Sequence, residues 1–372
     1  MQRYEIIANF AWMERGKSIE ALSLCFTAGV TGGTAVAAAA AGTAAAVLFP
    51  LLTLPLLFRE KLLRLGEKPA VGILLGTFLL LGLFCALSAA VPGAAPESRL
   101  QALAARAAGS LRAFIGSMNF PSEGTAPLLQ ALLTGDRSGL STETVAAFRG
   151  SGASHLLALS GLHMGILYLL FDSLTKPLGG SRPARLARFT VILGGAGFFT
   201  LMTGAGPSIT RAFLFIGLNE SLRLLGRPRK ATRVFCVALL IQLVLDPSVI
   251  RSLGFQLSYL AMAGIFLLYP VLEKWYPEGS RYNPLRWMWK AAAMSISCQV
   301  FTAPLAWLRF HTFPKWFILT NLLAIPLTTL TVWMAVLALL LAAAGLCPQL
   351  LLDATDGLCS LLTGTLGIIA SM

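Results

Sequence analysis

Two of the three histidines in this 372-residue chain lie in one short stretch, Ser154–Gly165, which reads SHLLALSGLHMG. The stretch belongs to an apolar, helix-forming region, yet it also holds two serines. A helix that faces lipid has no use for such groups, because polar side chains at membrane depth usually face a bundle interior or a water-filled cavity. We therefore expect His155, Ser160 and His163 to line or brace a central path.

The spacing of the two histidines argues against a metal site. Eight residues on a straight helix correspond to about 12 Å of rise and about 80° of rotation. One Zn²⁺ with bonds of about 2.0–2.1 Å could not reach both imidazoles. Ser160 and His163 share a helix face, which leaves an intramembrane hydrolase as an alternative, but no carboxylate in the stretch would orient the imidazole. We expect no catalytic residue, no metal and no cofactor, and therefore no enzyme.

Four further polar residues interrupt apolar segments and are assigned to the same path: Arg211, Gln256, Gln299 and Asn321. Arg211 follows Pro207, which suits the first residue of a helix. Its guanidinium could meet a phosphate near that helix start or could snorkel to the membrane interface. The three amides suit either interhelical hydrogen bonds, worth about 0.6 kcal/mol each, or a pore wall that wets without trapping an anion.

The composition indicates an integral membrane protein. Hydrophobic residues make up 56% of the chain and charged residues 12%, whereas a soluble domain has about 25% charged residues. We predict an all-α polytopic membrane protein with about 10–11 transmembrane helices, including broken or re-entrant helices, plus an amphipathic interfacial helix. The six cysteines have no metal-ligand or disulfide spacing.

The net charge of +13 is explained mainly by the excess of Lys and Arg in cytoplasmic loops. It also suits a polyanionic partner. The segment Arg223–Arg233 holds five basic residues and is predicted to be cytoplasmic. Alternation of spans then places the amino terminus and residues 176–188 on the same side.

The chain divides, in order, into four predicted regions. Residues 1–18 form a cytoplasmic tail, 19–92 a three-span membrane region, 93–150 an amphipathic helix and short helices on the outer side, and 151–372 a membrane channel core.

The amphipathic helix starts at Glu97, where apolar residues recur at the spacing of one helix face. Arg99 and Arg106 lie off that face and, with Asp136 and Arg137, are candidates for nucleic-acid contact. Asp136 and Arg137 could instead simply form a turn between two short helices.

Helix ends and breaks are predicted at three further places. The short helices are Thr125–Thr134 and Ser141–Arg149, with Ser141 and Thr142 as candidate N-caps of the second. Ser154–Phe171 is a span or a broken helix. Phe317–Ala344 is too long for one straight span and contains Pro326, so we expect a broken helix followed by a full one.

Four blocks of the sequence resemble the competence domain of the ComEC family, the membrane channel of bacterial DNA uptake. They are LLTGDRSGL with SHLLALSGLHMGIL, then GPSITRAFLFIGL, LDPSVIRSLGFQLSYLAMAGI and LTNLLAIPLTTL, in the family's order between Leu132 and Leu330. The resemblance implies a multi-pass channel of the inner (cytoplasmic) membrane that takes up single-stranded DNA during natural transformation. The OB-fold and metallo-β-lactamase-like domains of that family are not recognisable, so the chain resembles a short form.

The resemblance also implies the partners. They are single-stranded DNA, the lipid bilayer, a separate DNA receptor, a nuclease and a cytoplasmic motor or helicase, with a homo-oligomer as a further possibility. A motor is expected elsewhere because the sequence contains no nucleotide-binding P-loop. The main alternative is a small-molecule secondary transporter, which would need an acidic site at membrane depth, and no Asp or Glu is predicted clearly in mid-span.

Overall fold

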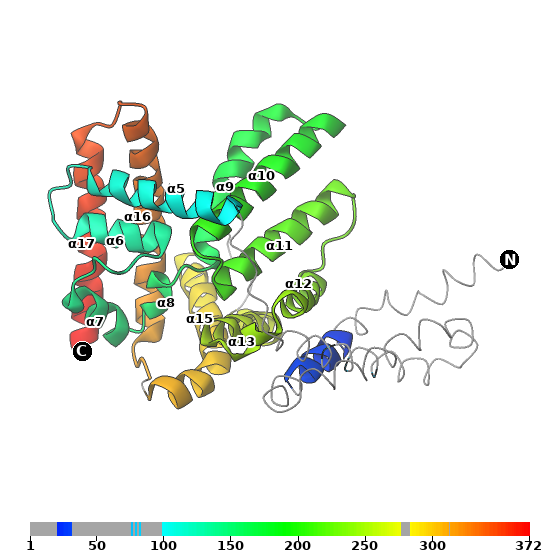
Figure 1. The fold of residues 1–372 in the computed structure, drawn as a ribbon. Coiled ribbons are helices and arrows are strands. Elements are labelled where there is room, and N and C mark those ends of the chain that lie inside the picture. The colour runs from blue at the N-terminus through cyan, green and yellow to red at the C-terminus, as the bar shows by residue number, and fades with distance from the viewer. Residues whose placement is uncertain are drawn as a thin grey trace, which may run out of the picture. The chain divides into compact units, whose positions relative to one another are not determined.

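The computed structural model describes residues 21–31, 76, 79, 82, 99–276, 283–311 and 313–372. Every regular element in this part of the chain is a helix (Figure 1). The predicted tail 1–18 and most of the three-span region 19–92 lie outside the described residues. From residue 99 onward the helices are α5 (Arg99–Gly116), α6 (Thr125–Thr134), α7 (Thr142–Gly150), α8 (Ser154–Leu157), α9 (Gly161–Thr175), the 3₁₀ helix η2 (Lys176–Leu178), α10 (Arg182–Met202), α11 (Pro207–Leu224), α12 (Ala231–Leu245), the 3₁₀ helix η3 (Pro247–Arg251), α13 (Leu253–Leu267), α14 (Tyr269–Glu273), α15 (Pro284–Phe310), α16 (Phe317–Ala343) and α17 (Gln349–Ser371).

Four of the described helices, α10, α15, α16 and α17, are long and apolar enough to cross a membrane. Shorter apolar helices occur at Ala21–Thr31, α6, α12 and α13. The prediction of an all-α membrane protein is therefore confirmed. The total of 10–11 crossings includes segments outside the described residues and stays a prediction.

The chain forms two compact units. One combines Met1–Pro96 with Leu214–Phe255, and the other combines Glu97–Phe213 with Gln256–Met372. In the first unit the Ser23 hydroxyl donates to the carbonyl of Cys236 over 3.4 Å. The second unit contains all four long apolar helices and the site described below.

The core of the second unit is built on α16 and α17, which run side by side in opposite directions (Figure 1). Buried leucines of α6 pack against this pair, and Leu128, Leu129 and Leu132 are almost completely enclosed. Leu362 and Leu366 of α17 belong to the same cluster. A ten-residue helix that is too short to be stable alone is thus held by tertiary packing.

The predicted amphipathic helix is present as α5, and its apolar residues divide between buried and exposed positions. Ala104, Ala108 and Ile115 are buried against the rest of the unit, where α5 packs on α6 and α10. Leu100 and Leu103 remain 63% and 55% exposed. The uncovered leucines suit a helix that lies in the membrane interface.

The predicted interruption near Pro326 is wrong, because α16 is one continuous helix of 27 residues with that proline inside it. A proline removes one backbone donor, but membrane helices tolerate it when neighbouring helices and Ser or Thr side chains support the turn. Here α16 packs on α15 and α17. The hydroxyl of Thr329 also donates to the carbonyl of Ile325 over 2.7 Å. The other predicted break, within Ser154–Phe171, is present between α8 and α9.

Candidate functional site at two interrupted helices

The stretch that contains the two histidines folds as a short helix, a break and a longer helix. Helix α8 ends after four residues because Ala158 is extended, with ψ 125°. Helix α9 then begins at Gly161, with Ser160 as its N-cap. The Ser160 hydroxyl accepts a hydrogen bond from the Leu162 N–H over 3.3 Å. A helix start inside an apolar region is thereby supplied with its own acceptor.

His163 completes this helix start. Its Nδ1 accepts a hydrogen bond from the Ser160 N–H over 3.3 Å, so the two side chains form a reciprocal capping box. A neutral imidazole that accepts at Nδ1 carries its proton on Nε2. His163 is 4% exposed, and its Nε2 has no hydrogen-bond partner among the described residues. The imidazole therefore braces the break, and its Nδ1 also lies 3.3 Å from the Ser160 hydroxyl oxygen.

The His163 ring borders a cavity of about 50 Å³ between four helices of the second unit. The other lining residues are apolar: Leu132, Leu133, Ile166, Leu167, Leu170, Phe199, Val332 and Val336. They come from α6, α9, α10 and α16. The cavity lies against the break and marks where these helices converge.

A second break follows α6. Gly135 ends that helix with a left-handed φ of 80°, and its N–H bonds to the carbonyl of Ala131. Asp136 then accepts hydrogen bonds from the N–H and the hydroxyl of Ser138, over 3.0 and 2.7 Å. Its other oxygen pairs with Arg112 of α5 at 2.6 Å. Asp136 therefore has partners within the protein. These contacts favour the turn between two short helices over the predicted contact with nucleic acid.

The two breaks touch each other. A Cβ on Gly135 would lie 2.6 Å from Cδ1 of Leu159, so a larger residue would have to displace that side chain. Arg137 donates from Nε to the carbonyl of Leu157 over 3.2 Å. That carbonyl lies at the last residue of α8, where the helix no longer provides a partner. The two sequence blocks around GDRSG and LALSG are therefore one structural site.

Arg211 reaches the same place from α11. Its Nη1 donates to the carbonyl of Ser258 in α13, and its guanidinium lies 5.8 Å from the ring centre of Tyr259, within cation–π range. Its Nη2 lies 3.9 Å from the position that a Cβ on Gly161 would take. The guanidinium thus sits beside the amino end of α9, where the helix dipole favours an anion.

Helices α13 and α15 approach each other very closely. A Cβ on Gly264 would clash with the Ser297 carbonyl oxygen. The thiol of Cys298 lies 3.9 Å from the carbonyl of Ala261. Small residues commonly allow membrane helices to approach in this way. The predicted residue Gln256 lies on α13, half-buried, two residues before Ser258.

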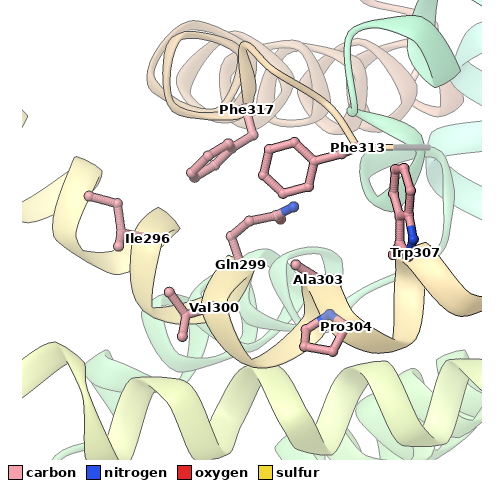
Figure 2. A pocket seen from close by; sticks show the side chains of 8 residues that line it. All are labelled: Ile296, Gln299, Val300, Ala303, Pro304, Trp307, Phe313 and Phe317. Carbon is pink, nitrogen blue, oxygen red and sulfur yellow. The ribbon is translucent and has the colours of Figure 1, made fainter. Parts of the chain in front are cut away.

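Gln299 occupies a different position from the residues at the breaks. It extends into an open groove of about 640 Å³, where its side chain points toward Phe313 and Phe317 (Figure 2). The groove is otherwise apolar and is lined also by Ile296, Val300, Ala303, Pro304 and Trp307. Asn321 lies one turn beyond Phe317 on α16 and is half-buried.

The structure thus brings together four of the predicted residues: Arg137, Ser160, His163 and Arg211. His155 is exposed, with Nδ1 3.1 Å from the carbonyl of Gly152. Arg99 and Arg106 are exposed on α5.

Asp356 was not predicted as a site residue from the sequence, although it has a structural role. Asp356 of α17 is only 8% exposed and lies inside a candidate span. It accepts hydrogen bonds from the Ser122 N–H, the Ser122 hydroxyl and the Thr125 hydroxyl, over 3.0, 2.8 and 2.5 Å. Asp356 caps the start of α6 from another helix. The sequence signal that could have identified Asp356 is a carboxylate inside the apolar run Leu350–Met372.

Comparison with known proteins gives consistent matches. A family described as Competence protein matches residues 132–372. ComE operon protein 3 of Bacillus subtilis is 28% identical over 203 residues, which is 54% of this chain and 24% of that protein. Competence protein ComA of Neisseria gonorrhoeae is 30% identical over 174 residues, 45% of this chain and 25% of that protein.

A third relative, the uncharacterized protein YcaI of Escherichia coli, is 28% identical over 201 residues, 52% of this chain and 26% of that protein. The matches thus cover about a quarter of the length of each of these relatives. No solved structure matches the chain.

Proposed function

Because the chain belongs to the ComEC family of competence proteins, we propose that it is a multi-pass protein of the cytoplasmic membrane that admits single-stranded DNA during natural transformation. The observation that supports a path is the contact between the two helix breaks. Irregular backbone at membrane depth is tolerated where it is buried in protein or lines a water-filled cavity. Discontinuous helices of this kind form the substrate sites of many transporters.

The proposed mechanism is passive guidance. Arg211 and Arg137 provide separated cations for phosphate groups, and the net charge of +13 favours approach of a polyanion. Conduction requires groups that attract the strand without holding it. The neutral side chains Ser160 and Gln256 would contribute hydrogen bonds of that weaker kind.

Energy and processing would come from other proteins. We expect a separate receptor to deliver the strand, a nuclease to remove its complement and a cytoplasmic motor or helicase to pull it. The chain itself would need no cofactor and would perform no catalysis. Ser160 serves as a helix cap, which supports a structural role better than a nucleophilic one.

Asp356 favours a secondary transporter, because it is a buried carboxylate within a candidate span. Its two oxygens already accept three hydrogen bonds from the segment that starts α6. A group held in this way stabilises a helix end, whereas a coupling site must release and rebind its ion. We therefore retain DNA passage as the better proposal.

Gene deletion tests the proposal directly, with labelled DNA counted on each side of the cytoplasmic membrane. We expect DNA to accumulate outside that membrane in the deletion strain. Complementation with Arg211→Gln should restore protein abundance but not entry, while Arg185→Gln, an exposed arginine on α10, should restore both. Undiminished entry in the deletion strain would refute the proposed function.

A further inference from the structure

The segment that joins α5 to α8 contacts both ends of helix α17, so the length of α17 gives the distance that the segment covers. At its start, Gln349 donates from Nε2 to the carbonyl of Asn119 over 3.2 Å. At its other end, Ala370 lies against Gly150, with 3.0 Å between its Cβ and the position of a glycine Cβ. Residues 119–150 therefore connect one end of α17 to the other.

The distance covered matches a membrane. Ala370 lies 21 positions after Gln349, which corresponds to about 32 Å of helix, and the hydrocarbon core of a bilayer is about 30 Å thick. Helix α17 is itself long and apolar enough to cross. If it does, Asn119 and Gly150 lie at opposite faces of the membrane, whereas the sequence alone predicts that the whole region 93–150 lies on the outer side.

The break after α6 lies near the middle of this distance. At the start of α16 the Thr320 hydroxyl donates to the carbonyl of Ser151 over 2.8 Å. Leu133, just before the break, lines the same cavity as Val332. Thr320 and Val332 are 12 residues apart on α16, or about 18 Å. The chain between Gly135 and Gly139 therefore lies between the two ends of α17, within reach of Arg112 of α5.

Part of this break is nevertheless exposed. Arg137, Ser138 and Gly139 are exposed in the described structure. A charged side chain and open backbone do not face lipid tails at such depth, so that face must meet water or a polar solute. Asp136 is paired with Arg112, which leaves the charge of Arg137 uncompensated within the turn. The bond from its Nε to the carbonyl of Leu157 orients the guanidinium, whose Nη groups could bind a phosphate.

We propose that residues 119–150 cross the membrane as two short helices, α6 and α7, and that the break between them presents Arg137 to phosphate groups of a strand inside the membrane. The crossing stands on the packing alone, while the role of Arg137 rests on the proposed function. A guanidinium fork matches phosphate geometry better than an ammonium group does.

Cysteine labelling tests the crossing without DNA. In a chain without its native cysteines, Asn119→Cys and Arg149→Cys, both at exposed positions, would be treated with a membrane-impermeant maleimide on cells and on inverted vesicles. Leu350→Cys and Met372→Cys would report the ends of α17 in the same way. We expect Asn119→Cys to react on the same side as Leu350→Cys, and Arg149→Cys on the same side as Met372→Cys. Labelling of the Asn119→Cys and Arg149→Cys variants from one side would overturn the crossing.

A third position tests the water-exposed break. We expect Ser138→Cys to react with a small charged methanethiosulfonate reagent, and Leu337→Cys, half exposed on α16, to react only with a lipid-soluble one. Reaction of the Ser138→Cys variant with the lipid-soluble reagent alone would overturn a wet break.

The role of Arg137 is measured in cells. Arg137→Gln should lower DNA entry about tenfold, as expected when one charge-assisted contact is lost, while the labelling pattern stays unchanged. Arg185→Gln serves as the matched control. Normal entry with Arg137→Gln, in a strain where deletion abolishes entry, would overturn the role of Arg137. Entry that does not depend on the gene at all would instead refute the proposed function.

Discussion

The backbone N–H of Ser160 donates to Nδ1 of His163 over 3.3 Å, while the Ser160 hydroxyl accepts from the start of the same helix. The pair therefore works as a capping box in which histidine takes the place usually held by Glu or Gln. This relationship explains why serine and histidine occur three residues apart in an apolar region. It gives the two residues a structural role, which variants can distinguish from the hydrolase alternative.

Substitutions at Ser160 distinguish the two roles. Ser160→Ala should lower the free energy of unfolding by about 1 kcal/mol, because an N-cap acceptor is lost. Ser160→Asn should retain stability and DNA entry, since asparagine caps as well as serine but is no nucleophile. Thermal unfolding in detergent and DNA-entry assays measure both effects. Loss of function in Ser160→Asn with unchanged stability would favour the hydrolase.

His163 offers a parallel test. His163→Gln should be tolerated, because glutamine at this position can accept the same backbone N–H. His163→Leu should reduce the free energy of unfolding by about 1 kcal/mol, since the Ser160 N–H loses its partner. Folded yield and melting temperature provide the measurement. Equal stability of the two variants would show that the capping box does not matter.

Gly135 should not tolerate a side chain. Its φ of 80° is unfavourable for other residues by roughly 1–2 kcal/mol, and an added Cβ would also meet Leu159. Gly135→Ala is therefore expected to reduce folded protein. Gly165→Ala is the control, because Gly165 lies within α9 with open space around its Cβ position, and alanine favours a helix by about 1 kcal/mol. Similar yields of both variants would contradict the close contact between the breaks.

Asp356 should matter for folding more than its exposed neighbour on the same helix. Asp356→Ala leaves one backbone N–H and two hydroxyl groups without their acceptor, which costs about 1–3 kcal/mol for each group that stays buried. Asp353→Ala removes only an exposed hydrogen bond with Gln349 and should have little effect. Fluorescence-detected size exclusion of both variants measures folded protein. A well-folded Asp356→Ala variant that fails in transport would point to the transporter alternative.

Much of the architecture could be predicted because it depends on local chemistry. Composition alone indicates the membrane class. The N-cap at Ser141, whose hydroxyl accepts from the Thr144 N–H over 3.1 Å, is predictable from neighbouring residues. The break within Ser154–Phe171 is expected for the same reason, since Ser and Gly there provide a helix start. These interactions join residues that are two to four positions apart, so the sequence contains them directly.

Other features depend on residues that are far apart in the chain. Asp356 and Ser122 are separated by 234 positions, and Arg211 and Ser258 by 47. No periodicity relates such partners, because their meeting depends on which helix faces pack together.

Pro326 shows that tertiary packing can also override a local sequence signal. Its local effect is to break a helix, yet packing on α15 and α17 keeps α16 whole. The sequence by itself determined the membrane class, the helices and their capped ends. Only the tertiary structure decided which breaks meet and which charges are paired, because those depend on free energies of packing between distant segments.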